Sequence, residues 1–173
     1  KNNYNRNGVY EVKMFLDSVL SFSYKMDKIN MSIRKTGMEN KNNRVKWLQK
    51  TLERIEPGRK ILDAGAGELQ YRELCSHLIY VSQDFGKYTG IGDSIGLQKD
   101  RKWEQDNLDI ISDITSIPEE SSSFDVIMCI EVIEHVPDPM AAIKELTRLL
   151  KPGGELILTA PFCSLSHFTP YYY

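Results

Sequence analysis

The stretch KILDAGAGELQY at residues 60–71 constrains the fold of this 173-residue chain more than any other. Its apolar start predicts a buried strand, and Asp63 stands at the carboxyl end of that strand. Gly65 and Gly67 then allow a sharp turn and a close approach by a ligand, because glycine has no Cβ atom. Ligands of open parallel sheets bind outside the carboxyl ends of the strands. The stretch therefore predicts a strand, a ligand-binding loop and the start of a helix.

The residues of this loop discriminate between classes of cofactor. A dinucleotide fingerprint requires G-x-G-x-x-G, and the frame that starts at Gly65 has Gln70 in its last position. Glu68 would also place a negative charge where a pyrophosphate binds at a helix N-terminus. Both features argue against NAD or FAD, whereas Asp63 and Glu68 suit a ligand that carries positive charge. A turn that binds no ligand remains an alternative.

Strand and helix patterns alternate along the rest of the chain, which indicates an α/β fold with a parallel sheet and right-handed crossovers. Apolar runs predict strands at residues 60–63, 79–84, 108–112, 124–130 and 155–160. Helical spacing of apolar residues predicts helices at 10–24, 43–55 and 69–78 and one that Asp138 and Pro139 open. Asn42 or Asn43 is the expected cap of the second helix. The expected buried face of the last helix consists of Met140, Ile143, Leu146 and Leu150.

Three segments in the same order resemble the class I, Rossmann-like methyltransferases that use S-adenosylmethionine (SAM). KILDAGAGELQY is similar to their acidic-x-Gly-x-Gly-x-Gly motif, with Leu69 in place of the third glycine. FDVIMCIEVIEHVPDP and LLKPGGELILTAP are similar to their segments around the fourth and fifth strands. The resemblance covers about residues 45–160. It implies a Rossmann-like parallel sheet flanked by helices, SAM as cofactor, and methyl transfer to a small-molecule acceptor that the sequence does not identify.

Candidate cofactor-binding residues follow the predicted strands. Asp84 lies 21 residues after Asp63, the spacing of a carboxylate that accepts both ribose hydroxyls; a solvated loop acid is the alternative. The resemblance implies that Asp113 accepts from the adenine amino group while the backbone of Ile114 meets the ring, with Ile114 and Ile117 as apolar flank. A turn aspartate is the alternative for Asp113. Together with the backbone after the fourth strand, the expected cofactor set is Asp63, Gly65, Ala66, Gly67, Asp84, Asp113, Ile114, Ile130 and Glu131.

Two histidines are candidate catalytic residues. His167 follows the fifth strand, where a histidine near its ordinary pKa accepts a proton from an attacking hydroxyl. His135 follows the fourth strand, and packing in a loop is an equal interpretation for it. A loop residue without a role is the alternative for His167. His77 is expected to be structural.

The charge and cysteine content of the chain limit which partners and which compartment we expect. The net charge of −2 provides no general electrostatic reason for binding nucleic acid or an anionic membrane. The three cysteines are too scattered for a disulfide framework or a zinc site, so we expect free thiols in a cytoplasmic, reducing compartment and no metal. No apolar run reaches the roughly 20 residues that span a bilayer.

The expected domains are an N-terminal helical lid at residues 1–42 and a SAM-binding domain at 43–173. Similar methyltransferases have seven strands, whereas thirteen residues follow Ala160 here. We therefore expect the last strands to be absent, the chain to be a piece of a longer methyltransferase, and residues 155–160 to form a sheet edge. Three alternatives remain open: a SAM-binding domain without transferase activity, an NAD-linked oxidoreductase and a non-enzymatic interaction module.

Overall fold

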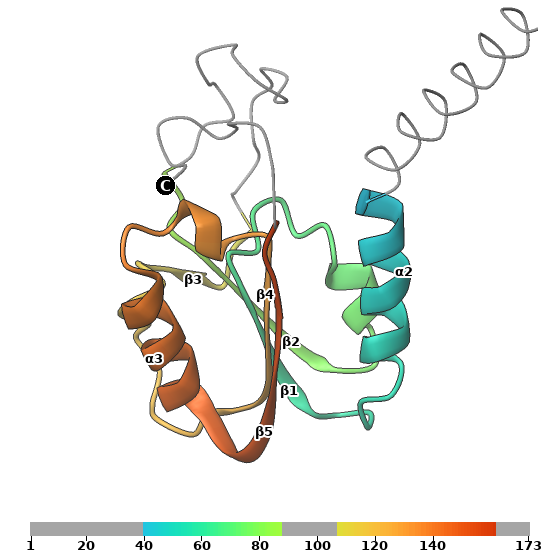
Figure 1. The fold of residues 1–173 in the computed structure, drawn as a ribbon. Helices are drawn as coiled ribbons and strands as arrows, with labels where there is room; N and C mark the ends of the chain where they lie inside the picture. Colours follow the sequence, from blue (N-terminus) through green and yellow to red (C-terminus); the bar gives the residue numbers. More distant parts are fainter. Residues whose placement is uncertain (1–39, 88–106, 162–173) are drawn as a thin grey trace, which may run out of the picture. The chain divides into compact units, whose positions relative to one another are not determined.

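The computed structural model describes residues 40–87 and 107–161 (Figure 1). By its internal contacts the chain divides into two units, residues 1–51 and 52–173, and each is considered by itself. The expected helix at 10–24, the lid at 1–42, most of the insertion at 86–107 and the tail with His167 lie wholly or mainly outside the described residues.

The described part of the first unit is helix α2, whose bounds are Asn40–Leu52. The helix therefore begins before the predicted position, and Asn42 and Asn43 lie within it and do not cap it. Leu48 and Leu52 are fully buried, as the helical spacing predicted. The Thr51 hydroxyl, also buried, donates to the Trp47 carbonyl oxygen at 2.9 Å, so this polar group is satisfied within the helix.

A parallel five-stranded sheet forms the second unit, as predicted (Figure 1). The strand order is β3-β2-β1-β4-β5, and every neighbouring pair runs parallel. Because β1 lies between β2 and β4, its carboxyl end stands where the strand order reverses, the usual ligand position of open α/β sheets. The strands are β1 (Lys60–Ala64), β2 (Ile79–Asp84), β3 (Ile110–Ile111), β4 (Phe124–Ile130) and β5 (Leu150–Thr159).

Two strands depart from their predicted bounds for identifiable reasons. β3 contains two residues because the side chains of Asp109 and Ser82 replace backbone pairing before it: Asp109 Oδ2 accepts from Ser82 N at 2.9 Å, and Ser82 Oγ accepts from Asp109 N at 3.0 Å. β5 begins at Leu150, five residues early. Its pairing with β4 shifts register between Phe124 and Val126, so the Pro-Gly-Gly segment lies in an irregularity of the strand.

The helix predicted at residues 69–78 is wrong. Turns and a short 3-10 helix, η1 (Arg72–Cys75), occupy this segment. Leu69 has a φ of 60°, a left-handed conformation that an α-helix does not accommodate. The chain therefore leaves the glycine loop through turns and enters β2 after a single helical turn.

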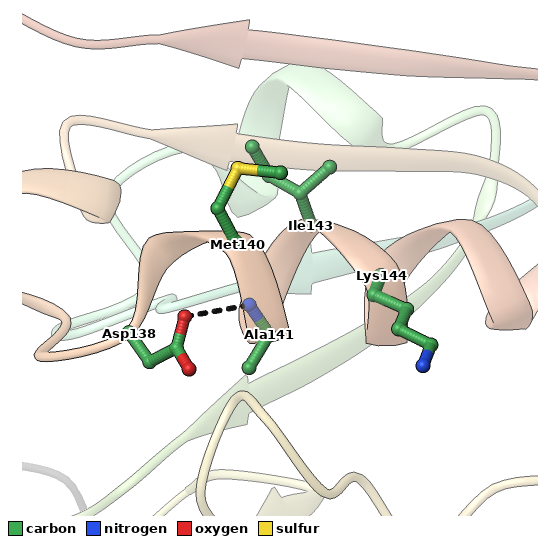
Figure 2. A pocket seen from close by; sticks show the side chains of 5 residues that line it. All are labelled: Asp138, Met140, Ala141, Ile143 and Lys144. Atoms are coloured by element: carbon green, nitrogen blue, oxygen red, sulfur yellow. Dashed lines mark hydrogen bonds between the residues drawn. The ribbon is translucent and has the colours of Figure 1, made fainter.

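Helix α3 (Pro139–Leu149) begins where the sequence predicted, with Asp138 Oδ1 accepting from Ala141 N at 2.9 Å (Figure 2). Its buried residues are Ala142, Leu146 and Leu149. Of the four residues predicted to form the buried face, only Leu146 is fully buried, and Met140 is 72% exposed. The buried face is therefore rotated from the predicted one, and Ala142, which is fully buried in the core, belongs to it.

A single core cluster joins α3 to the sheet. Six of the seven β4 residues are buried, as expected for a strand covered on both faces. The cluster consists of Leu62, Ala64, Ile114, Ile117, Phe124, Ile127, Cys129, Val136, Ala142, Leu146 and Leu149.

Candidate functional site

The loop after β1 folds back onto the end of β2. Gly65 and Gly67 have φ values of 80° and 53°, the left-handed conformations that the glycine pattern predicted. The backbone N–H groups of Gly65 and Ala66 both donate to the Gln83 carbonyl oxygen, at 2.8 and 2.9 Å. The loop is therefore held at the carboxyl edge of the sheet, directly beside the end of β2.

Asp84 connects the two loops at this edge. Its side chain is buried, with the residue 7% exposed. Its Oδ2 atom accepts from Gly67 N at 3.0 Å, and its Oδ1 atom accepts from Gly86 N at 3.0 Å. The structure thus brings together the glycine loop and the carboxylate that sequence spacing paired with it.

Asp63 is buried beside this loop, with 2% of the residue exposed. Its Oδ2 atom accepts a hydrogen bond from the Tyr80 hydroxyl at 2.6 Å. Burial raises the pKa of Asp63 to about 7, the Tyr80 hydrogen bond partly offsets that rise, and the charge of Asp84 adds to it. A carboxyl group with a pKa near neutrality changes its charge readily when a charged ligand arrives.

Gly65 also contacts the segment after β4. A Cβ atom at this position would lie 2.5 Å from Cγ2 of Val132, far inside ordinary contact. The absence of a side chain is therefore required by packing within the protein, in addition to the positive φ. The sequence indicated the turn at Gly65 but not this contact, which depends on how β4 ends.

The segment after β4 begins with an unusual backbone conformation. Ile130 ends the strand and is buried, and Glu131 has a φ of 56°, uncommon for a residue other than glycine. The backbone N–H of Glu131 donates to the Thr159 carbonyl oxygen at 3.0 Å. Such outliers cluster at functional sites, so this one supports the predicted role of the segment.

His135 ends the 3-10 helix η2 (Ile133–His135) that follows. Its Nε2 atom lies 3.7 Å from Oε1 of Glu134, an ion pair when the histidine is protonated. Both side chains are largely buried, with 15% and 9% exposed. The position is compatible with a packing role and with proton transfer, so the two interpretations remain. His77, in contrast, has its Nε2 atom 3.2 Å from the Leu52 carbonyl oxygen, in keeping with a structural role.

Asp113 adopts the turn that was its alternative interpretation. Its Oδ1 atom accepts from the backbone N–H of Thr115 at 2.8 Å and from the Thr115 hydroxyl at 2.7 Å. These two hydrogen bonds, the backbone one foremost, lower the pKa of Asp113. The side chains of Ile114 and Ile117 are buried in the core cluster, and their contact with an adenine stays a prediction. The adenine contacts of the Asp113 side chain and the Ile114 backbone likewise stay predictions.

The sequence missed Tyr80 and three buried polar atoms. Tyr80 and Asp84 lie two residues either side of Ser82, which pairs with Asp63 in the register of β1 and β2. Because side chains alternate along a strand, a paired-strand alignment places all four on one face. The polar atoms are buried without a hydrogen-bond partner in the described part of the chain: Tyr71 Oη, Gln83 Oε1 and Thr159 Oγ1.

Features of other site types are few in the described ranges. Residues 40–87 and 107–161 contain no group of side chains that could hold a metal ion, and Cys75 and Cys129 are buried free thiols. Within the same residues no helix has the length and apolarity needed to cross a membrane. A surface hollow lies along α3 (Figure 2), lined by Asp138, Met140, Ala141, Ile143 and Lys144. A hollow built on one helix face encloses no ligand, so it is not the candidate site.

Comparison with known sequences identifies methyltransferase relatives. The family profile described as "Methyltransferase domain" matches residues 62–158. The ubiquinone biosynthesis O-methyltransferase of Xanthomonas axonopodis pv. citri is 33% identical over 114 residues, which are 61% of this chain and 45% of that protein. The protein of the same name from Coxiella burnetii is 36% identical over 109 residues, 59% of this chain and 43% of that protein. The chain thus spans less than half the length of these curated relatives.

Comparison with solved structures confirms the fold. The YcgJ protein from Bacillus subtilis matches with a TM-score of 0.51 and 22% identity, over 68% of this chain and 50% of that chain. The PH0226 protein from Pyrococcus horikoshii OT3 matches with a TM-score of 0.50 and 20% identity, over 69% of this chain and 57% of that chain.

Proposed function

The chain belongs to the methyltransferase-domain family, whose profile matches more than half of its length, and we propose that it transfers a methyl group from SAM to a small-molecule acceptor. The observation that carries the proposal is the glycine loop held against two buried carboxyl groups, Asp63 and Asp84, at the strand-order reversal. A loop of this kind, beside acids and without a phosphate-binding pattern, suits a cofactor that carries cationic groups.

The residues at the carboxyl edge fit SAM. Each carboxylate oxygen of Asp84 accepts a hydrogen bond at this edge, from the backbone N–H groups of Gly67 and Gly86, which orients the carboxylate at the end of β2. A carboxylate in this position, 21 residues after Asp63, is suited to accepting from the two ribose hydroxyls. Asp63 and Glu131 supply acidic groups near the loop and after β4, which suit the ammonium and sulfonium of the same molecule.

In this proposal the chain mainly binds SAM and the acceptor and orients them for methyl transfer. SAM supplies an electrophilic methyl group when bound. Asp84 holds the ribose, and the backbone of residues 65–67 approaches the cofactor closely. The backbone of Ile130 and Glu131, after β4, lines the methionine end. Asp113 with the backbone of Ile114 contacts the adenine. Methyl transfer requires alignment of donor and acceptor and exclusion of water, and burial of the acidic groups at this edge supports both.

A small-molecule acceptor with an attacking oxygen is the second part of the proposal. It is supported by the curated relatives, which are named ubiquinone biosynthesis O-methyltransferases. His135 and His167 are the proposed proton acceptors for such a hydroxyl. His135 is compatible with this role because it follows β4 and its Nε2 atom lies 3.7 Å from Oε1 of Glu134.

Two measurements test the function. Calorimetry is expected to detect binding of SAM and S-adenosylhomocysteine, whereas NADH is expected to leave the melting temperature unchanged. Incubation with SAM and a panel of phenolic and other small acceptors is expected to yield S-adenosylhomocysteine, detected by mass spectrometry. Binding without product for every acceptor would favour the SAM-binding domain without transferase activity, and a response to NADH alone would favour an oxidoreductase.

Variants of two separate histidines test whether His135 is the proton acceptor. If His135 accepts the proton, His135→Gln lowers turnover at least tenfold and changes SAM affinity less than twofold, the loss expected for one general base. His77→Gln is the matched control, since its ring contacts a helix carbonyl away from the loop. Equal turnover in the two variants and the unaltered protein would return His135 to a packing role.

A further inference from the structure

The Asp63–Tyr80 pair has a geometry that cofactor binding alone does not require. The Tyr80 hydroxyl lies 2.6 Å from Asp63 Oδ2, a short hydrogen bond between side chains of adjacent strands. Asp63 is 2% exposed, so water does not replace this donor. The Tyr80 ring is itself contacted by the Arg72 guanidinium, 5.9 Å from the ring centroid. The Tyr80 hydroxyl therefore contacts the Asp63 carboxyl group, while the Tyr80 ring contacts Arg72.

The groups that face Asp63 come from three elements. β2 supplies Tyr80 and Asp84, η1 supplies Cys75, and β4 supplies Cys129; Arg72, also of η1, acts on Tyr80. Burial, with the charge of Asp63, raises the pKa of both thiols to about 12, and Glu134 adds to the effect at Cys129. The thiols therefore remain neutral. Arg72 contacts the tyrosine ring, and among the described residues no cationic side chain pairs with Asp63.

We propose that Tyr80 is a positioning residue: its hydroxyl holds the Asp63 carboxyl group at the end of β1, so that binding of a cationic cofactor releases a proton from Asp63. The inference rests on the proposed function, because it requires a cofactor with positive charge at this edge. It goes further by assigning a charge change to one residue and the control of that change to another.

The proton balance needs no further reactant. Burial raises the pKa of Asp63 to about 7, so the carboxyl group is about half protonated in the free protein at neutral pH. A neighbouring cation favours the ionised form, and the displaced proton passes to solvent. Tyr80 keeps its own proton because burial raises the pKa of the phenol well above its ordinary value. The hydroxyl therefore remains a donor over the whole working range of pH.

Proton release from Asp63 determines how SAM affinity changes with pH. Below pH 7 the cofactor binds a protein that must lose a proton, so affinity falls as pH falls; above pH 7 the carboxylate is already ionised and affinity levels off. Between pH 6 and pH 8 the affinity for SAM is expected to rise about tenfold from Asp63 alone, given its pKa of about 7. The amino group of the ligand titrates at about pH 8 as well, so a variant must supply the baseline.

Two variants separate the effect of the Asp63 charge from the effect of its positioning by Tyr80. Asp63→Asn removes the titrating group and is expected to leave only the pH dependence of the ligand. Tyr80→Phe removes a hydrogen bond that favours the ionised carboxylate, so the inflection of affinity should move to higher pH, with near-normal affinity above it. Tyr71→Phe is the matched control, because Tyr71 is also buried but its hydroxyl has no hydrogen-bond partner in the described structure. A merely structural role of Tyr80 would weaken binding equally at every pH.

The test is calorimetric titration of SAM at pH 7 in phosphate and in Tris, whose ionisation enthalpies differ. The unaltered protein and Tyr71→Phe should release about half a proton more per SAM bound than Asp63→Asn does, as the pKa of about 7 requires. Equal proton release with and without the carboxyl group, or an unshifted inflection in Tyr80→Phe, would overturn the inference while leaving SAM binding intact. Absence of SAM binding at every pH would overturn the proposed function and the inference together. If Asp63→Asn fails to fold, the shift in Tyr80→Phe against Tyr71→Phe decides alone.

Discussion

At the amino end of the parallel strands the chain surrounds a carboxylate with its own cations, and at the carboxyl end it does not. Asp125, on β4, accepts from the backbone N–H of Lys60 at 2.9 Å, from Lys151 Nζ at 2.9 Å and from Arg59 Nη1 at 3.3 Å. Asp63, on the adjacent strand β1, accepts from the neutral hydroxyl of Tyr80.

The two edges shift the pKa of an aspartate carboxyl group in opposite directions. The Lys60 backbone bond, followed by the Lys151 bond, lowers the pKa of Asp125 to about 2, whereas burial raises the pKa of Asp63 to about 7. At the amino edge, cationic side chains of the chain itself therefore balance the negative charge of Asp125. The charge of Asp63 is compensated when a cation binds from outside. The comparison teaches that a carboxyl group marks a binding site here when no cationic side chain in the described part of the chain pairs with it. Five experiments test the account.

The largest expected effect concerns two glycines, one at each edge. Gly58 and Gly65 have nearly equal φ values of 82° and 80°, but a Cβ atom meets nothing within 4 Å at Gly58 and meets Val132 at 2.5 Å at Gly65. Gly58→Ala should cost about 1 kcal/mol of unfolding free energy, the cost of left-handed backbone alone. Gly65→Ala should cost about 3 kcal/mol, because overpacking is added to the same strain.

Urea unfolding measures both values. The excess loss in Gly65→Ala should be accompanied by loss of SAM binding, whereas Gly58→Ala should bind normally. Equal losses of stability would mean that the contact with Val132 adjusts at no cost, and retained SAM affinity in Gly65→Ala would remove the loop from the site.

The second experiment compares asparagine at the two aspartates. At pH 8, Asp63→Asn should stabilise the fold by about 2 kcal/mol, because the buried charge is removed while an amide oxygen still accepts from Tyr80. Asp125→Asn should destabilise it by about 1 kcal/mol, a value reduced by solvent screening near the surface.

The pH dependence of these two effects has opposite sign. The folded pKa of Asp63 is raised, so its contribution is favourable below pH 4 and is lost as pH rises through about 7; the gain from Asp63→Asn therefore grows between pH 5 and pH 8. The folded pKa of Asp125 is lowered, so its contribution is present above pH 4 and is lost as pH falls through about 2. Thermal unfolding at several pH values checks both. A destabilised Asp63→Asn at pH 8 would contradict the electrostatic contrast.

The sequence predicted the sheet well because the information for it is local. The apolar run of β4 and the glycine turn after β1 each report on neighbouring residues, and both were confirmed. The Asp63–Tyr80 hydrogen bond and the Gly65–Val132 contact were not foreseen, because each depends on the register or ending of a second strand. Met140 was misplaced for a similar reason: helical spacing defines an apolar stripe but not which side of it meets the sheet.

The third experiment removes Asp84, where sequence spacing did find the partner. Asp84→Ala should weaken SAM binding more than tenfold, because two charge-assisted hydrogen bonds of roughly 1.5 kcal/mol each are lost. Asp109→Ala is the matched control: its carboxylate also holds β2, through Ser82, but it does not contact the glycine loop and is not one of the predicted cofactor residues. Calorimetric affinity within twofold of the unaltered protein in both variants would exclude ribose binding by Asp84.

The smallest effect concerns Leu69, which has the position of the missing third glycine. Its φ of 60° shows that the glycine-like conformation persists without the glycine. Leu69→Gly should therefore be more stable than Leu69→Ala by about 1 kcal/mol, the reverse of the usual order for these two residues. Chemical denaturation compares the pair directly. The usual order, with alanine more stable, would show that this loop relaxes out of the left-handed conformation.

Hydrogen exchange with and without saturating SAM tests the contrast between the edges most directly. Peptides that cover residues 63–69 and 82–87 contain the amides of Gly67 and Gly86, which donate to Asp84, and these should exchange more slowly when SAM is bound. Peptides that cover residues 57–60 and 123–126, at the completed amino edge, should exchange at an unchanged rate. Slower exchange at the amino edge, or no change at the carboxyl edge with SAM bound, would contradict the assignment of the cofactor site.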